Sequence, residues 1–352
     1  MAFSERISYL SANMPWFGGH TGYFRLLPEY VRREGADVRV FHPKRGIARR
    51  MCGKLFSLIT SLPPRNQALT FAELCLMLRD RFQSEPGITH LLNFEEHCDL
   101  FLKLPQPVRR WFGTIHLPPS QWTDSMLGGL KHLSSAIMLY QRDIGNFERY
   151  VGKDRVRFVH YGVDTEFFRP GAGRIDAPPR VLYSGLYLRN TGMLARVIRK
   201  LHSAHPSLRF DLLVPLHARA DPHLQSLREH RAVSWHAGLD DEQLLDLHRQ
   251  SQLLLLPMNE SGANTAVVEA LACGLPIVTT DVGGIRDYGG GTLFPVVANN
   301  DDDAMVALVE QYLARPPWRD EVGIKCRRFA EETLAFPLTA RRHLALYREL
   351  SA

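Results

Sequence analysis

The chain has little of what membrane-spanning or secreted proteins need. It lacks an apolar run approaching the roughly eighteen residues of a membrane-spanning helix. Residues 1–15 carry Glu5 and Arg6 and lead directly into a strand-like segment, which is not typical of a secretory signal. The five cysteines are scattered without a Cys-x-x-Cys pair, a pattern that excludes a disulfide framework and a zinc site and favours a reducing compartment. We therefore expect a cytoplasmic protein.

Composition places the chain among ordinary globular proteins. Its 352 residues are 45% hydrophobic and 23% charged, enough for two domains. The net charge is +6, and many cations lie between residues 32 and 65. No base-stacking aromatics are interleaved with these cations and no nucleic-acid-binding motif is present, so we expect no nucleic-acid partner. An anionic substrate or an anionic membrane surface remains as the partner of the positive charge.

Short apolar segments alternate with helix-length segments along the whole chain. Strands are predicted within 7–14, 37–43, 89–94, 109–119, 135–143 and 156–164, and a second series within 181–185, 208–215, 232–238, 252–258, 275–280 and 291–297. This alternation is typical of parallel α/β sheets. Residues 167–181, rich in Pro and Gly, read as a linker. We expect an α/β protein with domains at 1–170 and 171–335, a terminal helix at 336–352, and a ligand site between the halves.

The segment 260–284, "ESGANTAVVEALACGLPIVTTDVGG", carries the clearest chemical signal. A buried strand precedes a tight turn, a helix is predicted to begin near Asn264 and Thr265, and Gly274 is predicted to end it. Gly262 and Ala263 leave backbone N–H groups open at that helix start, where anions bind. Glu269, one turn inside the helix, is either a carboxylate that answers a cation or hydroxyl of the protein itself, or a ligand-binding group.

This segment resembles the signature of the GT-B glycosyltransferases of family 4. The resemblance extends to "HYGVDTEFFRP" (160–170), to "HAGLDDEQLLDLHRQSQLLLLPM" (236–258) and to "LAFPLTARRHLALYREL" (334–350). It implies two Rossmann-like domains facing a central cleft, with a C-terminal helix that crosses back to the first domain. It also implies a retaining transfer of a sugar from a nucleotide-sugar to an acceptor hydroxyl, with no metal ion and no further cofactor. The acceptor is expected to be a glycan, a glycolipid or a small molecule.

The resemblance assigns roles to particular residues. Glu269 is expected to accept hydrogen bonds from the donor ribose hydroxyls, since a carboxylate can accept from two neighbouring hydroxyls. The expected donor-binding set is Gly18, Gly19, Leu239, Glu260, Ser261, Gly262, Ala263, Asn264, Thr265 and Glu269. His116, which follows a predicted strand, is expected beside the transferred sugar as a catalytic residue, although a histidine after a strand is more often structural. His20 is expected to face either the acceptor or solvent.

The sequence departs from the family pattern at two places. The first glutamate of the family's pair is replaced by Ser261, so either Glu260 reaches in after a local shift, or Ser261 and the backbone serve the sugar. The family's diphosphate-binding Arg and Lys are replaced by Leu186 and Thr191, which leaves Arg189 as the nearby candidate for that charge. These departures keep two alternatives open: a nucleotide-sugar epimerase on the same architecture, and a catalytically silent nucleotide-sugar-binding protein.

Three other acidic or glycine-rich segments are interpreted as structural. The aspartates at 301–303 read as a solvated helix N-terminus. "FEEHCD" (94–99) lacks metal-ligand spacing, and "PGAGR" (170–174) lacks the strand-to-helix context of a dinucleotide-binding loop.

Residues 44–65 have the pattern of an amphipathic helix. Its apolar positions 47, 51, 55, 58 and 59 fall close to one face, and most cations lie on the others: Lys44, Arg45, Arg49, Arg50 and Lys54. One interpretation is a surface helix that packs this face on its own domain. The other is a helix that lies peripherally on the inner membrane surface or binds an anionic acceptor.

Overall fold

The computed structural model describes residues 6–11, 19–42, 46–60, 71–76, 78, 87–97, 110–171 and 178–351. The chain folds into two compact units. Unit 1 comprises Met1–Phe17, Gly22–His160 and Phe336–Ala352, and unit 2 comprises Gly18–Thr21 and Tyr161–Ala335. The linker interpreted at 167–181 includes residues 172–177, which lie outside the described residues.

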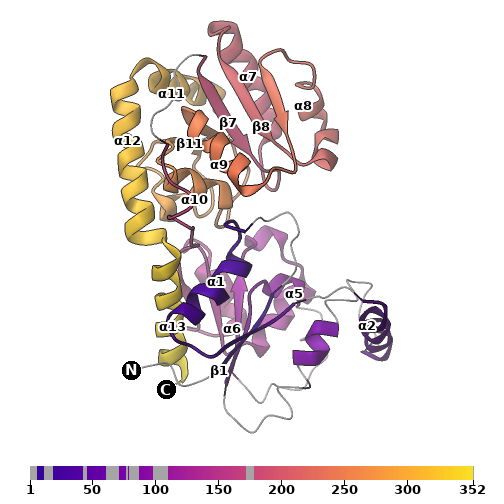
Figure 1. The fold of residues 1–352 in the computed structure, drawn as a ribbon. Helices are drawn as coiled ribbons and strands as arrows, with labels where there is room; N and C mark the ends of the chain where they lie inside the picture. Colours follow the sequence, from indigo (N-terminus) through magenta and orange to yellow (C-terminus); the bar gives the residue numbers. More distant parts are fainter. Residues whose placement is uncertain are drawn as a thin grey trace. The chain divides into compact units, whose positions relative to one another are not determined.

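Unit 1 is a six-stranded parallel sheet flanked by helices (Figure 1). The strand order is β2-β1-β3-β4-β5-β6. The strands are β1 (Arg6–Leu10), β2 (Val38–Phe41), β3 (Gly87–Leu91), β4 (Arg110–Ile115), β5 (Ser135–Met138) and β6 (Val156–Phe158). The helices are α1 (Tyr23–Arg33), α2 (Ile47–Thr60), α5 (Asp124–Gly129), α6 (Ile144–Val151) and α13 (Phe336–Ser351). The helix expected at the C-terminal end is thus α13, and it belongs to unit 1.

Within unit 1, helix α13 is held against the rest of the unit by a buried polar network and by packing on α1. The Tyr347 hydroxyl lies 3.1 Å from that of Tyr9 in β1 and bonds to Nδ1 of His90 in β3. One helical turn earlier, His343 bonds to the Tyr23 hydroxyl of α1. Because buried polar groups are costly unless they are hydrogen-bonded, these bonds fix where α13 lies on unit 1.

Unit 2 is a second parallel sheet, with the order β12-β11-β10-β7-β8-β9. The strands are β7 (Arg180–Ser184), β8 (Arg209–Leu213), β9 (Val233–His236), β10 (Leu253–Leu256), β11 (Ile277–Thr280) and β12 (Val296–Val297). The helices are α7 (Thr191–Ala204), α8 (Pro222–Gln225), α9 (Asp241–Gln250), α10 (Thr265–Ala272), α11 (Asp302–Ala314) and α12 (Pro316–Phe329). All four leucines of β10 are fully buried, as expected for a central strand covered on both faces.

The predicted strands are all present, and the α/β fold class is confirmed. The segment predicted as a strand at 291–297 contributes only the two residues of β12. Gly289 and Gly291 have φ of +95° and +80°, and the Gly291 amide donates to the Phe294 carbonyl over 2.8 Å. This turn takes up the first half of the predicted strand. The interpretation of 301–303 as a helix N-terminus is also confirmed, since Asp301 caps α11 through the Ala304 amide over 3.0 Å. The expectation that all three aspartates are solvated is wrong for Asp302, which pairs with Arg196 over 2.6 Å and whose side chain is only 11% exposed.

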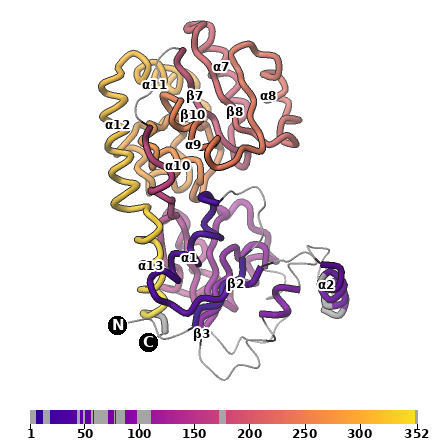
Figure 2. Tube along the Cα trace, in the orientation of Figure 1, coloured from indigo at the N-terminus to yellow at the C-terminus, as the bar shows by residue number. Residues whose placement is uncertain are grey.

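Helix α2 does not pack its apolar face on its own domain, so that interpretation is wrong. Four of its apolar side chains are exposed: Ile47 by 80%, Met51 by 66%, Leu55 by 59% and Leu58 by 68%. In Figure 2, α2 lies apart from the strands of unit 1. The helix itself was predicted, but the direction of its apolar face was not. Of the cations predicted to flank it, Lys44 and Arg45 lie outside the described residues.

Candidate functional site

The strand order of unit 2 creates a topological switch point between β7 and β10. Chain connections leave these neighbouring strands in opposite directions across the sheet, and in such sheets ligands bind beyond the carboxyl ends of the two strands. The loops that follow them are joined by backbone bonds: the Asn190 amide donates to the Pro257 carbonyl (3.0 Å) and the Asn259 amide to the Leu188 carbonyl (2.9 Å). Arg189 and Met258 pair between these bonds. The switch point is therefore closed by two interlocked loops.

Arg189 lies in the first of these loops, and its guanidinium reaches the start of α10. Nη2 donates to the Asn264 side-chain oxygen over 3.2 Å, and Nη1 donates to the Tyr187 carbonyl over 3.0 Å. Burial lowers the pKa of Arg189 from its usual value, but an arginine keeps its charge at neutral pH. Gly185, with φ +92°, leaves space for the guanidinium because it has no side chain: a Cβ there would stand 2.8 Å from Nη2. A fixed positive charge thus lies at the N-terminus of α10.

The second loop leads into α10 in the predicted way. Asn264 caps the helix by accepting from the Ala266 amide over 3.1 Å, and Gly274, at φ +62°, follows its end. The Ser261 hydroxyl donates to the Gly262 carbonyl over 2.9 Å, and Glu260 is half-buried. The open N–H groups of a helix start and the nearby guanidinium together form an arrangement that suits a phosphate group.

Two residues, one at the end of β11 and one just after it, position this second loop, and neither was predicted from the sequence. Thr280 Oγ1 accepts from the Met258 amide over 2.9 Å and donates to its carbonyl over 2.7 Å. Gly283, at φ +52°, lies directly on the backbone of Ser261, so that a Cβ would stand 1.7 Å from the Ser261 carbonyl oxygen. The "DVGG" sequence after a strand is the signal that could have indicated this close approach.

Glu269 lies inside α10 and is only 3% exposed. Its Oε1 accepts a hydrogen bond from the Thr21 hydroxyl over 2.9 Å. Its Oε2 lies 3.6 Å from Nε2 of the fully buried His248 in α9. The carboxylate therefore accepts a hydrogen bond from a hydroxyl of the protein itself, as one of the two interpretations of the sequence predicted. The same contact demonstrates that Oε1 is directed at a hydroxyl donor, the chemistry that a ribose would supply.

Residues 19–21 are part of unit 2 and contact its later segments. The amides of Gly19 and His20 both donate to Asp241 Oδ2, over 2.5 and 3.1 Å. The His20 ring stacks on Phe167 at 3.8 Å between centroids, and its Nδ1 lies 2.8 Å from Asp164 Oδ2. These bonds bring Gly19 and His20 to the N-terminal end of α9.

For the remaining predicted donor-binding residues, the structure gives their burial and one hydrogen bond. Leu239 is half-buried just before the α9 cap, Ala263 and Thr265 are half-buried, and Gly262 is buried. The Thr265 hydroxyl donates to the Tyr161 hydroxyl over 3.4 Å. Gly18 lies outside the described residues.

In unit 1, His116 follows β4 and is anchored by its ring. Nε2 donates to the Leu92 carbonyl over 2.7 Å, and the ring packs against those of Tyr23 and Phe24. Burial lowers the pKa of His116 to about 4, so the imidazole is neutral at pH 7. Its chemistry would then be that of a neutral hydrogen-bonding or dipolar group and not of a cation.

Glu95 supports the same loop, although its segment (94–99) was interpreted as structural from the sequence. Its Oε1 accepts from the His116 amide (2.5 Å) and from the Leu117 amide (2.8 Å). Burial raises the pKa of Glu95 to about 7. Glu95 lies just beyond β3, so it and His116 follow neighbouring strands of one sheet.

We expect His116→Ala to lower kcat at least about tenfold, the effect of losing about 1.4 kcal/mol of transition-state stabilisation. Nucleotide affinity should change less than about twofold, since the expected role of His116 concerns the sugar and not the nucleotide. Steady-state kinetics and calorimetry measure the two quantities. His132→Ala, at a half-buried histidine of the same unit, is the control. A variant with normal kcat and reduced thermal stability would make His116 structural.

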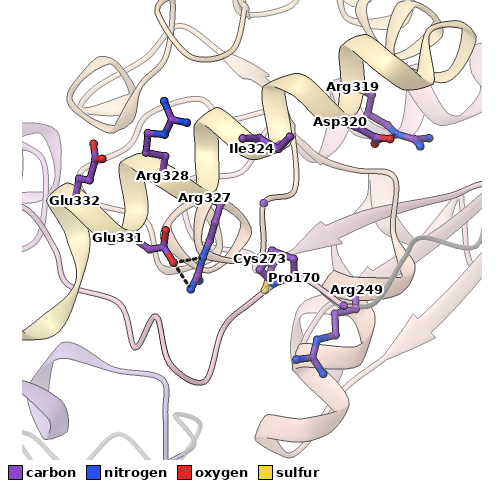
Figure 3. Close-up of a pocket in the computed structure, with 13 residues that line it drawn as sticks. Pro170, Arg249, Cys273, Arg319, Asp320, Ile324, Arg327, Arg328, Glu331 and Glu332 are labelled. Atoms are coloured by element: carbon purple, nitrogen blue, oxygen red, sulfur yellow. Dashed lines mark hydrogen bonds and ion pairs between the residues drawn. The ribbon is translucent and has the colours of Figure 1, made fainter.

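A cavity of about 600 Å³ lies at the other end of α10 (Figure 3). Cys273 and Gly274 line it, and none of the predicted donor-binding residues do. Its central cation, Arg327, donates to the carbonyls of Ala272, Phe168 and Thr165 over 2.7–3.0 Å and pairs with Glu331. Arg327 therefore fastens the C-terminal end of α10, whereas Arg189 and Asn264 meet at the opposite end of this helix.

Within the described ranges, no group of three or more His, Cys, Asp or Glu side chains could hold a metal ion. The same residues include no helix that is long and apolar enough to cross a membrane.

Comparison with known sequences agrees with the geometry of unit 2. Residues 178–315 match the family model described as glycosyl transferases group 1. An MMP alpha-(1->4)-mannosyltransferase of Mycolicibacterium hassiacum is 25% identical over 254 residues, which are 70% of this chain and 59% of the relative. A D-inositol 3-phosphate glycosyltransferase of Streptomyces avermitilis is 27% identical over 251 residues, 64% of this chain and 52% of the relative. The chain thus spans about half to three-fifths of these relatives' lengths.

Solved structures resemble the whole chain at low sequence identity. A sucrose-phosphate synthase from Thermosynechococcus elongatus has a TM-score of 0.77 at 18% identity and covers 98% of this chain and 99% of its own. HepE of Anabaena, solved in complex with UDP-glucose, has a TM-score of 0.71 at 11% identity, with 98% and 99% covered. Residues 178–315 thus match the model of the group 1 glycosyltransferases, and the chain has the GT-B fold of two Rossmann-like domains.

Proposed function

We propose that the chain transfers a sugar from a nucleotide-sugar to an acceptor hydroxyl of a glycan, a glycolipid or a small molecule. The observation that carries this proposal is the cluster at the switch point of unit 2. There Arg189 reaches Asn264 at the start of α10, and Glu269 lies one turn inside the same helix. The curated relatives are named as sugar transferases, and one structural neighbour was solved with UDP-glucose, both of which support the proposal.

In this proposal each group has a distinct task. Glu269 accepts from the ribose hydroxyls, and Arg189 together with the N–H groups at the start of α10 receives the diphosphate. As the bond to the sugar breaks, negative charge grows on the leaving diphosphate, and fixed donors and cations stabilise it without a metal ion. Arg189 replaces the Arg and Lys that the family carries at the positions of Leu186 and Thr191. Transfer with retention of anomeric configuration follows from the family resemblance and is part of the proposal.

A transfer assay with a panel of UDP-, GDP- and ADP-sugars tests this function. The acceptors would be glycans, extracted lipids and small polyols, and the readout would be released nucleoside diphosphate together with the glycosylated product. We expect product to depend on both donor and acceptor. Donor conversion without any acceptor would favour an epimerase, and nucleotide binding without turnover of any donor would favour a silent binding protein. Either outcome would contradict the proposed function.

We propose further that α2 lies on an anionic membrane surface. Its exposed apolar residues are spaced at one helical face: Ile47, Met51, Leu55 and Leu58. No aspartate or glutamate occurs between Asp37 and Glu73, whereas that stretch contains seven lysines and arginines. An exposed apolar stripe with cations alone beside it is complementary to an interface of acyl chains and anionic headgroups.

Binding to vesicles tests the membrane proposal. We expect the protein to co-sediment with phosphatidylglycerol vesicles at low salt and to be released at high salt, because each surface cation adds about 1 kcal/mol. Arg50→Glu with Lys54→Glu should abolish binding, and Met51→Ser with Leu55→Ser should weaken it. A matched control, Arg228→Glu with Arg315→Glu, reverses two exposed charges on unit 2. The proposal would be contradicted if wild type co-sedimented equally with neutral and anionic vesicles, or if it co-sedimented with neither.

A further inference from the structure

His248 is a fully buried histidine directly behind Glu269. It lies near the end of α9, where none of its surface is exposed. Neither ring nitrogen has a hydrogen-bond partner among the residues that the structure describes. A buried imidazole without partners is costly, since each unsatisfied polar group loses its hydration without replacement. The family resemblance assigns no role to His248, and apolar packing does not require a histidine at this position.

The nearest polar atom that the structure records for this imidazole belongs to Glu269. His248 Nε2 lies 3.6 Å from Glu269 Oε2, just beyond hydrogen-bond distance. The other carboxylate oxygen, Oε1, accepts from the Thr21 hydroxyl over 2.9 Å. The carboxylate therefore has an imidazole on one side and a hydroxyl donor on the other. Phe168 packs edge-on against the His248 ring, with an interplanar angle of 82°, and this contact limits the orientations of the imidazole.

We propose that His248 is a positioning residue for the donor site. Its Nε2, 3.6 Å from Oε2 of Glu269, is the polar group that faces this oxygen, and this contact favours the one orientation in which the carboxylate presents Oε1 to hydroxyl donors. A carboxylate that is held before binding loses less conformational freedom when the ribose arrives, and this gain appears as affinity. His248 touches neither nucleotide nor sugar in this account and acts through Glu269. The inference rests on the proposed function, because it takes the ribose as the ligand of Glu269.

Three substitutions at position 248 separate the role of Nε2 from that of ring packing. His248→Phe keeps the ring shape and removes both nitrogens. His248→Gln can place an N–H close to the position of Nε2, whereas His248→Asn can place one only near Nδ1. With whichever of UDP, GDP and ADP binds wild type most tightly, we expect His248→Phe and His248→Asn to weaken binding about tenfold, which corresponds to about 1.4 kcal/mol. His248→Gln should retain affinity within about threefold.

Two further measurements show whether the effect passes through Glu269. In a Glu269→Gln background, His248→Phe should cause little additional loss, because coupled residues give non-additive effects. With the 2′-deoxy form of the same nucleotide, the penalty of His248→Phe should shrink, because one ribose hydroxyl is missing. Thermal unfolding of each variant establishes that it is folded, and the Gln and Asn variants decide the question if the Phe variant is not.

The outcomes separate this inference from the function on which it rests. Wild-type affinity in His248→Phe or His248→Asn would overturn the inference. So would equal losses with ribose and 2′-deoxyribose nucleotides together with full additivity to Glu269→Gln, which would make His248 a packing residue only. In either case Glu269 could still bind nucleotide and the proposed function would stand. If wild type binds none of the three nucleotides, the proposed function and this inference both fail.

Discussion

Gly283→Ala should destabilise unit 2 by at least about 3 kcal/mol and remove nucleotide binding. A Cβ at this position would stand 1.7 Å from the Ser261 carbonyl oxygen and 2.6 Å from its carbonyl carbon, and both atoms belong to backbone. Overpacking alone costs about 1–3 kcal/mol, and a left-handed φ adds about 1–2 kcal/mol for a residue with a side chain. The Gly284 amide also donates to the Ser261 carbonyl over 3.0 Å, and a displaced backbone would lose this bond.

Gly238→Ala is the matched control for this variant. Gly238 has φ +65°, close to the +52° of Gly283, but no atom lies within 4 Å of a Cβ built there. It should therefore show the cost of the backbone conformation alone, about 1–2 kcal/mol. Thermal unfolding and nucleotide titration of both variants give the comparison. Equal stability of the two variants would contradict the close approach of Gly283 to Ser261.

Unit 1 should lose several kcal/mol of stability as the pH falls from 6.5 to about 4. His343 is fully buried, and burial lowers its pKa to about 4. His90 is equally buried, and burial lowers its pKa well below the usual value, with His343 and His116 adding to the effect. Burial holds both rings in the neutral form, although the bond from His343 Nδ1 to the Thr339 carbonyl partly opposes this for His343. Protonation therefore favours the unfolded chain.

The direction of this change of stability with pH follows from comparing proton binding in the folded and the unfolded states. An unfolded histidine titrates near pH 6.5, so above that pH both states are neutral and the full stability is present. Between pH 6.5 and about 4 the histidine binds a proton in the unfolded state, whereas His343 in the folded state stays neutral. Each such group lowers the free energy of unfolding by about 3 kcal/mol across this window. Glu95 acts in the opposite sense: its pKa, raised to about 7, favours the fold as the pH falls from 7 to 4.5. The stability that His116 loses as the pH falls is largely offset by the stability that Glu95 gains. The loss of stability caused by His90 and His343 remains.

Urea unfolding between pH 7.5 and 4.5, followed by hydrogen exchange in peptides from β1, β3 and α13, measures this loss in unit 1. His343→Gln should reduce the slope of stability against pH, because it removes one of the titrating groups. A flat or rising stability of unit 1 over this range would contradict neutral burial of His343 and His90.

Local signals were enough to predict the strands and the start and end of α10. Four consecutive leucines indicated β10, Asn264 marked the helix start, and Gly274 marked its end, because each of these preferences acts within a few residues. The strand order was not predicted, since it depends on which distant segments pair. For the same reason the position of Arg189 against Asn264, seventy-five residues further along the chain, needed the structure.

The supporting residues of the site were the least predictable. Thr280 and Gly283 hold the 258–264 loop from a different strand, and Glu95 holds the His116 loop from a neighbouring one. Thr21 and His248 meet Glu269 from positions 248 and 21 residues away in sequence. Periodicity predicted the amphipathic helix at α2, but it cannot tell whether an apolar face turns inward. The exposure of Ile47 and Met51 had to come from the fold.

The central claim is that Glu269, one turn inside α10 at the switch point of unit 2, binds the ribose of a nucleotide. Calorimetric titration of wild type, Glu269→Ala and the control Glu310→Ala with UDP, GDP and ADP tests it most directly. Glu310 is a surface carboxylate of α11 that bonds only to His205 among the described residues. Glu269→Ala should weaken binding by about 1.5–3 kcal/mol, or roughly 10- to 150-fold, while Glu310→Ala should bind like wild type. Unchanged affinity in folded Glu269→Ala would contradict the claim.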